Sequence, residues 1–167
     1  MALAGALAFS ACAGGVGELE KKYTTPSAPC GISLPPELLD VFLPGGDSIS
    51  VKPSAPNGGT KRCELIVDGN VSVRQTQTWW GKGESAATVA AAYDKMDDGQ
   101  VTDDNRYLYS GTGAVGEATT SCKSPAHPDQ TLYAVIQVFT PDRSDMGAMK
   151  RLITAYTKAL AVSGECS

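Results

Sequence analysis

The chain has 167 residues, of which 42% are hydrophobic and 19% charged, a balance typical of one exported globular domain with a short additional segment. Its net charge of −4 argues against a nucleic acid partner, which requires clustered Lys and Arg, and against electrostatic docking on anionic lipid. No stretch offers the roughly 20 consecutive apolar residues of a transmembrane helix.

The N-terminus is a short apolar run that ends in small residues, directly before Cys12. Phe9-Ser10-Ala11-Cys12 resembles the lipobox of bacterial lipoproteins, in which the cysteine sulfur receives a diacylglycerol. The resemblance implies that 1–11 is a signal peptide, truncated because it lacks a basic segment, and that Cys12 is lipidated. Charged and proline-rich residues then predict a lipid-anchored tether over 12–29. The alternative is a disordered Ala/Gly-rich N-terminus with a stray thiol.

Four further cysteines lie within 30–167, which we interpret as a single extracytoplasmic domain. Three pairings of four cysteines are possible. We favour Cys30 with Cys63 and Cys122 with Cys166, because the first pair joins the start of the domain to its first strong strand. The second pair would clamp the last helix. The spacing contains no CxxC pair, so zinc is disfavoured.

In chain order, turn and breaker residues separate helices from strands. Periodicity predicts helices at 35–43 and 86–96 and a last one that starts near Asp142 or Ser144 and closes at Gly164. Ser85 is the expected cap of the second helix. In the last helix, an apolar stripe is expected to face the core: Met149, Leu152, Ile153, Tyr156 and Leu160.

Strands are predicted at 62–67, 70–79, 106–109, near 118–122, and at 132–139, the last being central and covered on both faces. Asp68-Gly69 predicts a hairpin between the first two. Within 70–79, Thr76 and Thr78 are expected on a solvated face. Prolines and glycines predict loops at 44–60 and 123–129. The order indicates an α+β fold: an antiparallel sheet of about four to five strands, disulfide-stabilised, with helices packed on one face.

A set of landmarks resembles a known group of proteins: Arg62-Cys63-Glu64 at a strand start, Trp79-Trp80 at a hairpin end, and Gly113-Ala114-Val115-Gly116-Glu117-Ala118. Together with Cys12 and Cys30, these are similar to small actinobacterial cell-envelope lipoproteins of unknown function. Similar domains form the extracytoplasmic sensor part of some actinobacterial membrane kinases. The resemblance implies an exported, disulfide-stabilised α+β domain and supplies no catalytic residues.

Aromatic side chains are the main candidates for ligand binding. Trp79 and Trp80 are neighbours on a strand and therefore face opposite sides, so that one can be core and the other can line a ligand cleft. Tyr107 and Tyr109 share one strand face and could extend such a surface. Core or edge packing is the simpler reading of all four residues.

Metal and catalytic signals are weak. Asp97, Asp98 and Asp103 are calcium candidates in an acidic turn, but the segment fails the EF-hand pattern and a solvated turn is favoured over a metal site. His127, the only histidine, lies in a polar loop, and neither GxSxG nor S-x-x-K occurs. No catalytic residue is therefore assigned.

These observations predict a membrane-anchored extracytoplasmic lipoprotein whose domain is a non-catalytic binding or accessory module of the cell envelope, without a cofactor. Its expected partners are the membrane, through the lipid, and an envelope glycan, a small molecule or another membrane protein. Two alternatives stay open. A cell-wall-acting hydrolase would need two carboxylates about 5–9 Å apart, for which Glu64 and Glu117 are candidates. A structural envelope protein would show a flat apolar patch in place of a pocket.

Overall fold

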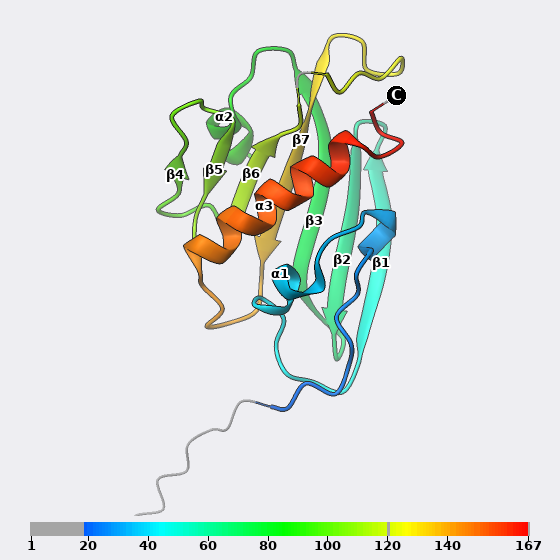
Figure 1. Ribbon diagram of the computed structural model, residues 1–167, viewed down its shortest axis with the longest axis vertical. Coiled ribbons are helices and arrows are strands. Elements are labelled where there is room, and N and C mark those ends of the chain that lie inside the picture. Colours follow the sequence, from blue (N-terminus) through cyan, green and yellow to red (C-terminus); the bar gives the residue numbers. More distant parts are fainter. Residues whose placement is uncertain (1–18, 120, 167) are drawn as a thin grey trace, which may run out of the picture.

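A seven-stranded antiparallel sheet is the centre of the computed structural model, which describes residues 19–119 and 121–166 (Figure 1). The strands lie in the order β1-β2-β3-β7-β6-β5-β4. Their bounds are β1 Ile49–Asn57, β2 Thr60–Val67, β3 Asn70–Gly81, β4 Gln100–Val101, β5 Tyr107–Tyr109, β6 Gly113–Glu117 and β7 Gln130–Val138. The antiparallel sheet is confirmed, whereas the expected number of four to five strands is wrong.

The hairpin of β2 and β3 forms where the sequence predicts it. Asp68 and Gly69 have φ angles of 46° and 82°, in the left-handed region that this hairpin turn requires. Thr76 and Thr78, expected on a solvated face, are only 0% and 4% exposed. They are buried because β3 is an interior strand between β2 and β7, so neighbouring side chains cover both of its faces.

The segment 44–60, expected to be a loop, contains the edge strand β1. Pro53 and Pro56 lie within β1, and its residues after Ile49 are exposed. Proline cannot donate to a strand ladder, so it is confined largely to sheet edges, where one side of the strand has no partner. The same prolines that indicate a loop are therefore compatible with this outermost strand.

The second half of the sheet also differs in detail from the prediction. The strand expected near 118–122 lies earlier, as β6, and β4 was not predicted. The hydroxyl of Ser110 fixes the turn before β6, since it accepts from the N–H of Gly113 at 2.9 Å and donates to the carbonyl of Lys95 at 2.8 Å. β7 is the central strand, and its residues from Leu132 to Val138 are all buried, as predicted.

Helices cover both faces of the sheet, so the expectation of helices on one face is wrong. Figure 1 shows α3 (Met146–Ala161) crossing the sheet diagonally, on the same side as α1 (Pro36–Asp40) and the 3-10 turn η1 (Pro29–Gly31). The short helix α2 (Ala86–Ala90) packs on the opposite face. Side chains that alternate along β7 are apolar on both faces, so each face requires a covering layer.

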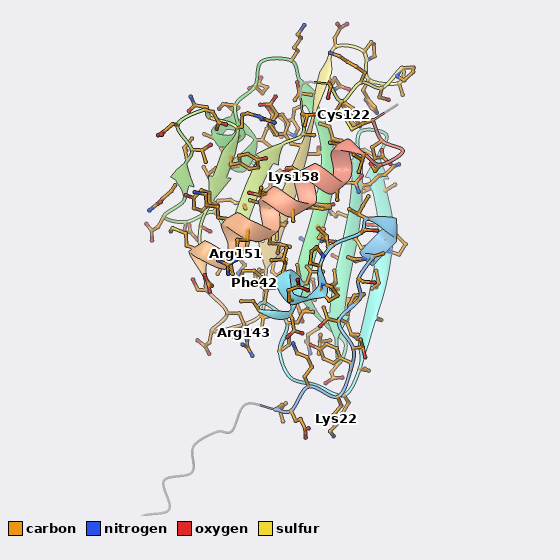
Figure 2. The ribbon with its side chains drawn as sticks, in the orientation of Figure 1. Lys22, Phe42, Cys122, Arg143, Arg151 and Lys158 are labelled. Carbon is orange, nitrogen blue, oxygen red and sulfur yellow. A yellow bond between two sulfur atoms is a disulfide. The ribbon has the colours of Figure 1, made fainter. Side chains whose placement is uncertain are left out.

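The core stripe of α3 is confirmed. Its five predicted residues are all buried: Met149, Leu152, Ile153, Tyr156 and Leu160. Arg151 and Lys158 lie on the outward side of the helix, whereas Phe42 is fully buried beside α1 (Figure 2). Asp145, rather than Asp142 or Ser144, caps α3 by accepting from the N–H of Ala148 at 2.8 Å.

Helix α2 begins as predicted but is shorter. The hydroxyl of Ser85 accepts from the N–H of Thr88 at 3.1 Å, which confirms the cap. The helix ends at Ala90 instead of near Met96. The chain then turns through Lys95, which has a φ of 72°. The carbonyl of Lys95 is held by hydroxyls of the turn before β6, and this tertiary contact competes with continuation of the helix.

Both predicted disulfides are present. Cys30 bonds to Cys63 with an S–S distance of 2.03 Å, and Cys122 bonds to Cys166 at 1.99 Å. The first bridge fastens η1 to β2. The second joins the segment after β6 to the chain end after α3, where Figure 2 labels Cys122.

The segment 19–29, expected as part of the tether, packs on the domain. Thr25 and Pro29 are buried, and the carboxylate of Asp40 accepts from Lys21 Nζ at 2.6 Å and from Thr25 Oγ1 at 2.5 Å. The folded part therefore begins before Cys30. The predicted signal peptide 1–11, the lipidation site Cys12 and the rest of the tether to residue 18 lie outside the described residues.

Candidate binding site

β3 directs a row of polar side chains toward the face that α3 covers. Gln75, Gln77 and Trp79 alternate with residues of the opposite face, and Gln75 stands directly opposite Cys63 of β2. Val73, two residues earlier on the same face, belongs to the main core. The row therefore continues a core face with glutamines, where an apolar side chain would be expected.

A cleft of about 410 Å³ lies over β2 and β3, between η1 and the chain end after α3. Gln75 and Gln77 line it from β3, Tyr156 lines it from α3, and the Cys30–Cys63 disulfide lines it from the side. Its volume falls within the range of about 300–1,000 Å³ typical of small-molecule sites.

The carboxamide of Gln75 has no partner. The side chain is 1% exposed, and neither its Oε1 nor its Nε2 makes a hydrogen bond in the structure. The Oε1 of Gln77 is also buried without a partner. Burying an amide without a hydrogen bond lowers the free energy of unfolding by roughly 1–3 kcal/mol, judged from protein mutational data. Each such group therefore calls for an explanation.

Tyr156 supplies a neutral phenol beside the two glutamines. Burial raises the pKa of Tyr156 well above its ordinary value, a hydrogen bond with Gln77 acts in the opposite direction, and the Glu165 carboxylate adds to the rise. The hydroxyl is therefore uncharged at physiological pH and can donate or accept a hydrogen bond.

An ion pair crosses the mouth of the cleft. Lys61 Nζ on β2 donates to Glu165 Oε1, in the segment that follows α3. Both residues line the cleft. Arg62 also lines the cleft, but strand alternation places its side chain on the opposite face of β2, beside Thr76. The charges of Lys61 and Glu165 compensate each other, so the mouth favours an uncharged ligand over an ion.

A second hollow, of about 250 Å³, adjoins the cleft beyond this ion pair. Trp79 and His127 line it, and their rings stack with centroids 4.7 Å apart and an interplanar angle of 10°. His127 Nδ1 also lies 2.6 Å from Gln130 Oε1. His127 lies in the loop expected from the sequence, where its ring is half-buried against Trp79.

The structure does not bring the four predicted aromatic residues together. Trp80 lies on the opposite face from Trp79 and packs against the α2 cluster. Tyr107 and Tyr109 pack against the main core near α3, where the Tyr107 hydroxyl is 3.1 Å from Thr157 Oγ1. Of the four, only Trp79 borders the hollow beside the cleft.

The carboxylates named from the sequence do not form a cluster either. Within 19–119 and 121–166, no group of three His, Cys, Asp or Glu side chains is placed to hold a metal, and this includes Asp97, Asp98 and Asp103. Glu64 and Glu117 lie on β2 and β6, three strand spacings or about 14 Å apart across the sheet. That separation exceeds the roughly 5–9.5 Å used in glycoside hydrolysis.

Gln75 and Gln77 were not identified from the sequence, although a signal for them exists. Strand alternation places both on the same face as Val73, and therefore among core residues. Two glutamines at core positions of a strand are unusual. Strand parity could thus have pointed to this cleft, whereas the adjacent tryptophans drew attention to the end of the strand.

Comparison of the chain with models of known protein families, with curated proteins and with solved structures gave no match. Among the helices of the described segments, none is both long and apolar enough to cross a membrane.

Proposed function

We propose that this chain is a membrane-anchored extracytoplasmic lipoprotein whose domain is a non-catalytic module that binds a small polar ligand of the cell envelope. The lipobox-like segment before Cys12 supports the anchor. Two disulfides support export, because such bonds persist in oxidising compartments. The cleft over β2 and β3 supports a binding module over a structural envelope protein.

The observation that carries this proposal is the unpartnered carboxamide of Gln75 in the cleft. An amide offers one acceptor and a donor group in fixed geometry. A ligand that carries its own donor and acceptor can satisfy both atoms at once. Binding would then remove a cost that the free protein bears, and it would discriminate against ligands that lack those groups.

The direct test is an NMR titration of the folded domain with soluble fragments released by lysozyme from actinobacterial peptidoglycan. We expect the side-chain amide resonances of Gln75 and Gln77 to shift, while those of Gln137 on the opposite face stay in place. A titration that leaves both cleft glutamines unmoved at millimolar fragment concentration would count against the proposal.

A matched pair of variants separates binding from folding. Gln75→Leu removes the unpartnered amide, and we expect it to abolish the shifts while the free energy of unfolding stays equal or rises by about 1 kcal/mol. Thr76→Val removes the buried, unpartnered Oγ1 of the next residue, which faces the other side of the sheet. This control should keep full binding. Equal loss in both variants would contradict a role for the cleft.

The anchor is tested separately in an actinobacterial host. We expect the wild-type protein in the membrane fraction, with the mass of its N-terminal peptide increased by a diacylglycerol at Cys12. Cys12→Ser should release the domain from the membrane, since the acyl chains supply about 0.8 kcal/mol per buried methylene. An unmodified Cys12 in the wild-type protein would refute the anchor and leave the binding proposal to its own test.

A further inference from the structure

The cleft and the hollow beside it adjoin each other over β2 and β3. Both are lined by the same three residues, Lys61, Gln77 and Glu165. The hollow adds the stacked pair of Trp79 and His127 at one end, and the cleft holds Gln75 at the other. Together the two cavities make up one elongated site, here called the groove, and the Lys61–Glu165 ion pair lies across its middle.

β3 forms a straight floor for this groove. Gln75, Gln77 and Trp79 lie on one face at alternate positions of the strand. With a rise of about 3.3–3.4 Å per residue, the first and last are about 13 Å apart. A ligand that touches both ends must be elongated, and longer than a single sugar ring or amino acid.

The chemistry changes in a defined way along this floor. One end offers an unpartnered carboxamide, the middle offers a compensated ion pair, and the other end offers aromatic rings. We infer that the groove binds an uncharged, N-acetylated oligosaccharide of at least two sugar units. An acetamido group would pair with Gln75, and a second sugar ring would pack its apolar face on the Trp79–His127 pair. This inference rests on the proposed function and specifies its ligand.

A peptide is the alternative ligand with amide groups, and the charges of the groove favour the glycan over it. A short envelope peptide carries carboxylates, which would have to separate Lys61 from Glu165 or remain unpaired in the groove. The chain as a whole is acidic, with a net charge of −4. An acetamido sugar combines an amide with an apolar ring face in one uncharged unit.

The test uses three uncharged saccharides on the full folded domain: N,N′-diacetylchitobiose, N-acetylglucosamine and cellobiose. We expect diacetylchitobiose to bind at least tenfold more tightly than either of the others in calorimetry, because only it has both the amide and the length. Saturation-transfer NMR on the wild-type protein should show the strongest transfer to an acetamido methyl group. This readout does not depend on any variant folding.

Two pairs of neighbouring residues then identify the ends of the groove. Trp79→Leu should remove the advantage of the disaccharide over N-acetylglucosamine, while Trp80→Leu, on the opposite face, should retain it. Gln75→Leu should remove the advantage of diacetylchitobiose over cellobiose, while Thr76→Val should retain it. The larger, non-aromatic Trp79→Met serves if Trp79→Leu does not fold.

The outcomes distinguish this inference from the proposal on which it rests. Cellobiose binding as tightly as diacetylchitobiose would overturn the inference. A cell-wall tetrapeptide that shifts the Gln75 resonance when no saccharide does would also overturn the inference. The proposed binding module would stand in that case. If neither the saccharides nor the lysozyme fragments shift that resonance, both fail, and the carboxamide is satisfied by water only.

Discussion

At the scale of single residues, Asp68 shows how one carboxylate joins two parts of the backbone. Its Oδ2 accepts from the N–H of Asp47 and its Oδ1 from the N–H of Ser48, both at 2.9 Å. These backbone hydrogen bonds, first that of Asp47 and then that of Ser48, hold the pKa of Asp68 below its ordinary value. The hairpin turn is thereby fastened to the residues that precede β1.

We expect this contact to make stability depend on pH. The pKa of Asp68 in the folded state lies below its unfolded-state value of about 3.9. The stabilisation is therefore complete above the unfolded-state pKa, and it is lost as the pH falls through the folded-state pKa. Asp68→Asn keeps a residue that tolerates positive φ but removes the charge. The urea midpoint of the wild type should therefore fall more steeply than that of the variant between about pH 5 and pH 2. Parallel curves would refute this, and Asp103→Asn, an exposed carboxylate outside these contacts, is the control.

Residue-level prediction from the sequence succeeded where local chemistry decides the outcome. The Asp68-Gly69 turn follows from the backbone conformations that these two residue types allow. The disulfides were chosen from the places of the cysteines relative to the first predicted strand and the last predicted helix, and the structure has the favoured pairing. Strand parity marks Gln75 as an unusual core residue, but it does not reveal that β2, η1 and Tyr156 enclose a cleft around it. The lack of a hydrogen-bond partner for the Gln75 carboxamide is a property of the assembled fold.

At the scale of elements, the Gly113–Glu117 segment is explained by packing. β6 lies between a helix on each face, and its glycines allow close approach. A Cβ on Gly116 would lie 2.6 Å from Thr157 Cγ2 of α3 and 2.9 Å from the ring of Tyr107. A Cβ on Gly113 would meet the backbone of Lys95 on the other side of the sheet. Gly113 and Gly116 are thus required by the close packing of this strand.

Gly116→Ala should consequently destabilise the domain. Forcing a methyl group between β6 and α3 requires a shift of the helix, and overpacking of this kind costs about 1–3 kcal/mol. Chemical denaturation of the variant would measure the loss. Gly164→Ala is the matched control, because an added Cβ there meets nothing within 4 Å and the φ of Gly164 is not positive. Its effect should stay within about 0.5 kcal/mol; similar losses in both variants would contradict the packing explanation.

The start of α3 provides a second prediction for an element. Asp145→Ala removes the acceptor for the N–H of Ala148 and should lower the free energy of unfolding by about 1 kcal/mol. Ser144→Ala, at the neighbouring residue that the sequence also suggested as a cap, should change it by less than about 0.5 kcal/mol. Thermal unfolding of the two variants compares them directly. The reverse order would place the cap at Ser144.

Elements were predicted well where their periodicity is strong and poorly where the tertiary structure overrides it. The α3 stripe and the apolar β7 were found because long, regular patterns identify them. β1 was missed because prolines at a sheet edge resemble those of a loop. α2 was predicted too long because its helical pattern continues toward Met96, whereas contacts of the Lys95 carbonyl with the turn before β6 redirect the chain. These contacts join parts of the chain that no local window includes.

At the scale of the whole molecule, the disulfides fasten the first and last segments of the folded domain, one to β2 and the other to the segment that follows β6. Cys30–Cys63 holds the N-terminal segment on β2 and closes a loop over a separation of 33 residues. Cys122–Cys166 holds the segment after α3 and closes one over 44 residues. Each loop is long, so chain entropy predicts about 4 kcal/mol of stabilisation from each bridge. The same two end segments also contribute walls of the groove, through Cys30 and Glu165.

Removal of both bridges should therefore unfold the domain. Together they supply about 8 kcal/mol in the loop-entropy account, which is comparable with the whole stability of about 5–15 kcal/mol of a typical domain. The variants Cys30→Ala/Cys63→Ala and Cys122→Ala/Cys166→Ala should each fold with a lowered urea midpoint, whereas the variant with all four alanines should lack cooperative unfolding in circular dichroism at 37 °C. A four-alanine variant with a midpoint near that of the wild type would show that the sheet and its two helical layers are sufficient without the bridges.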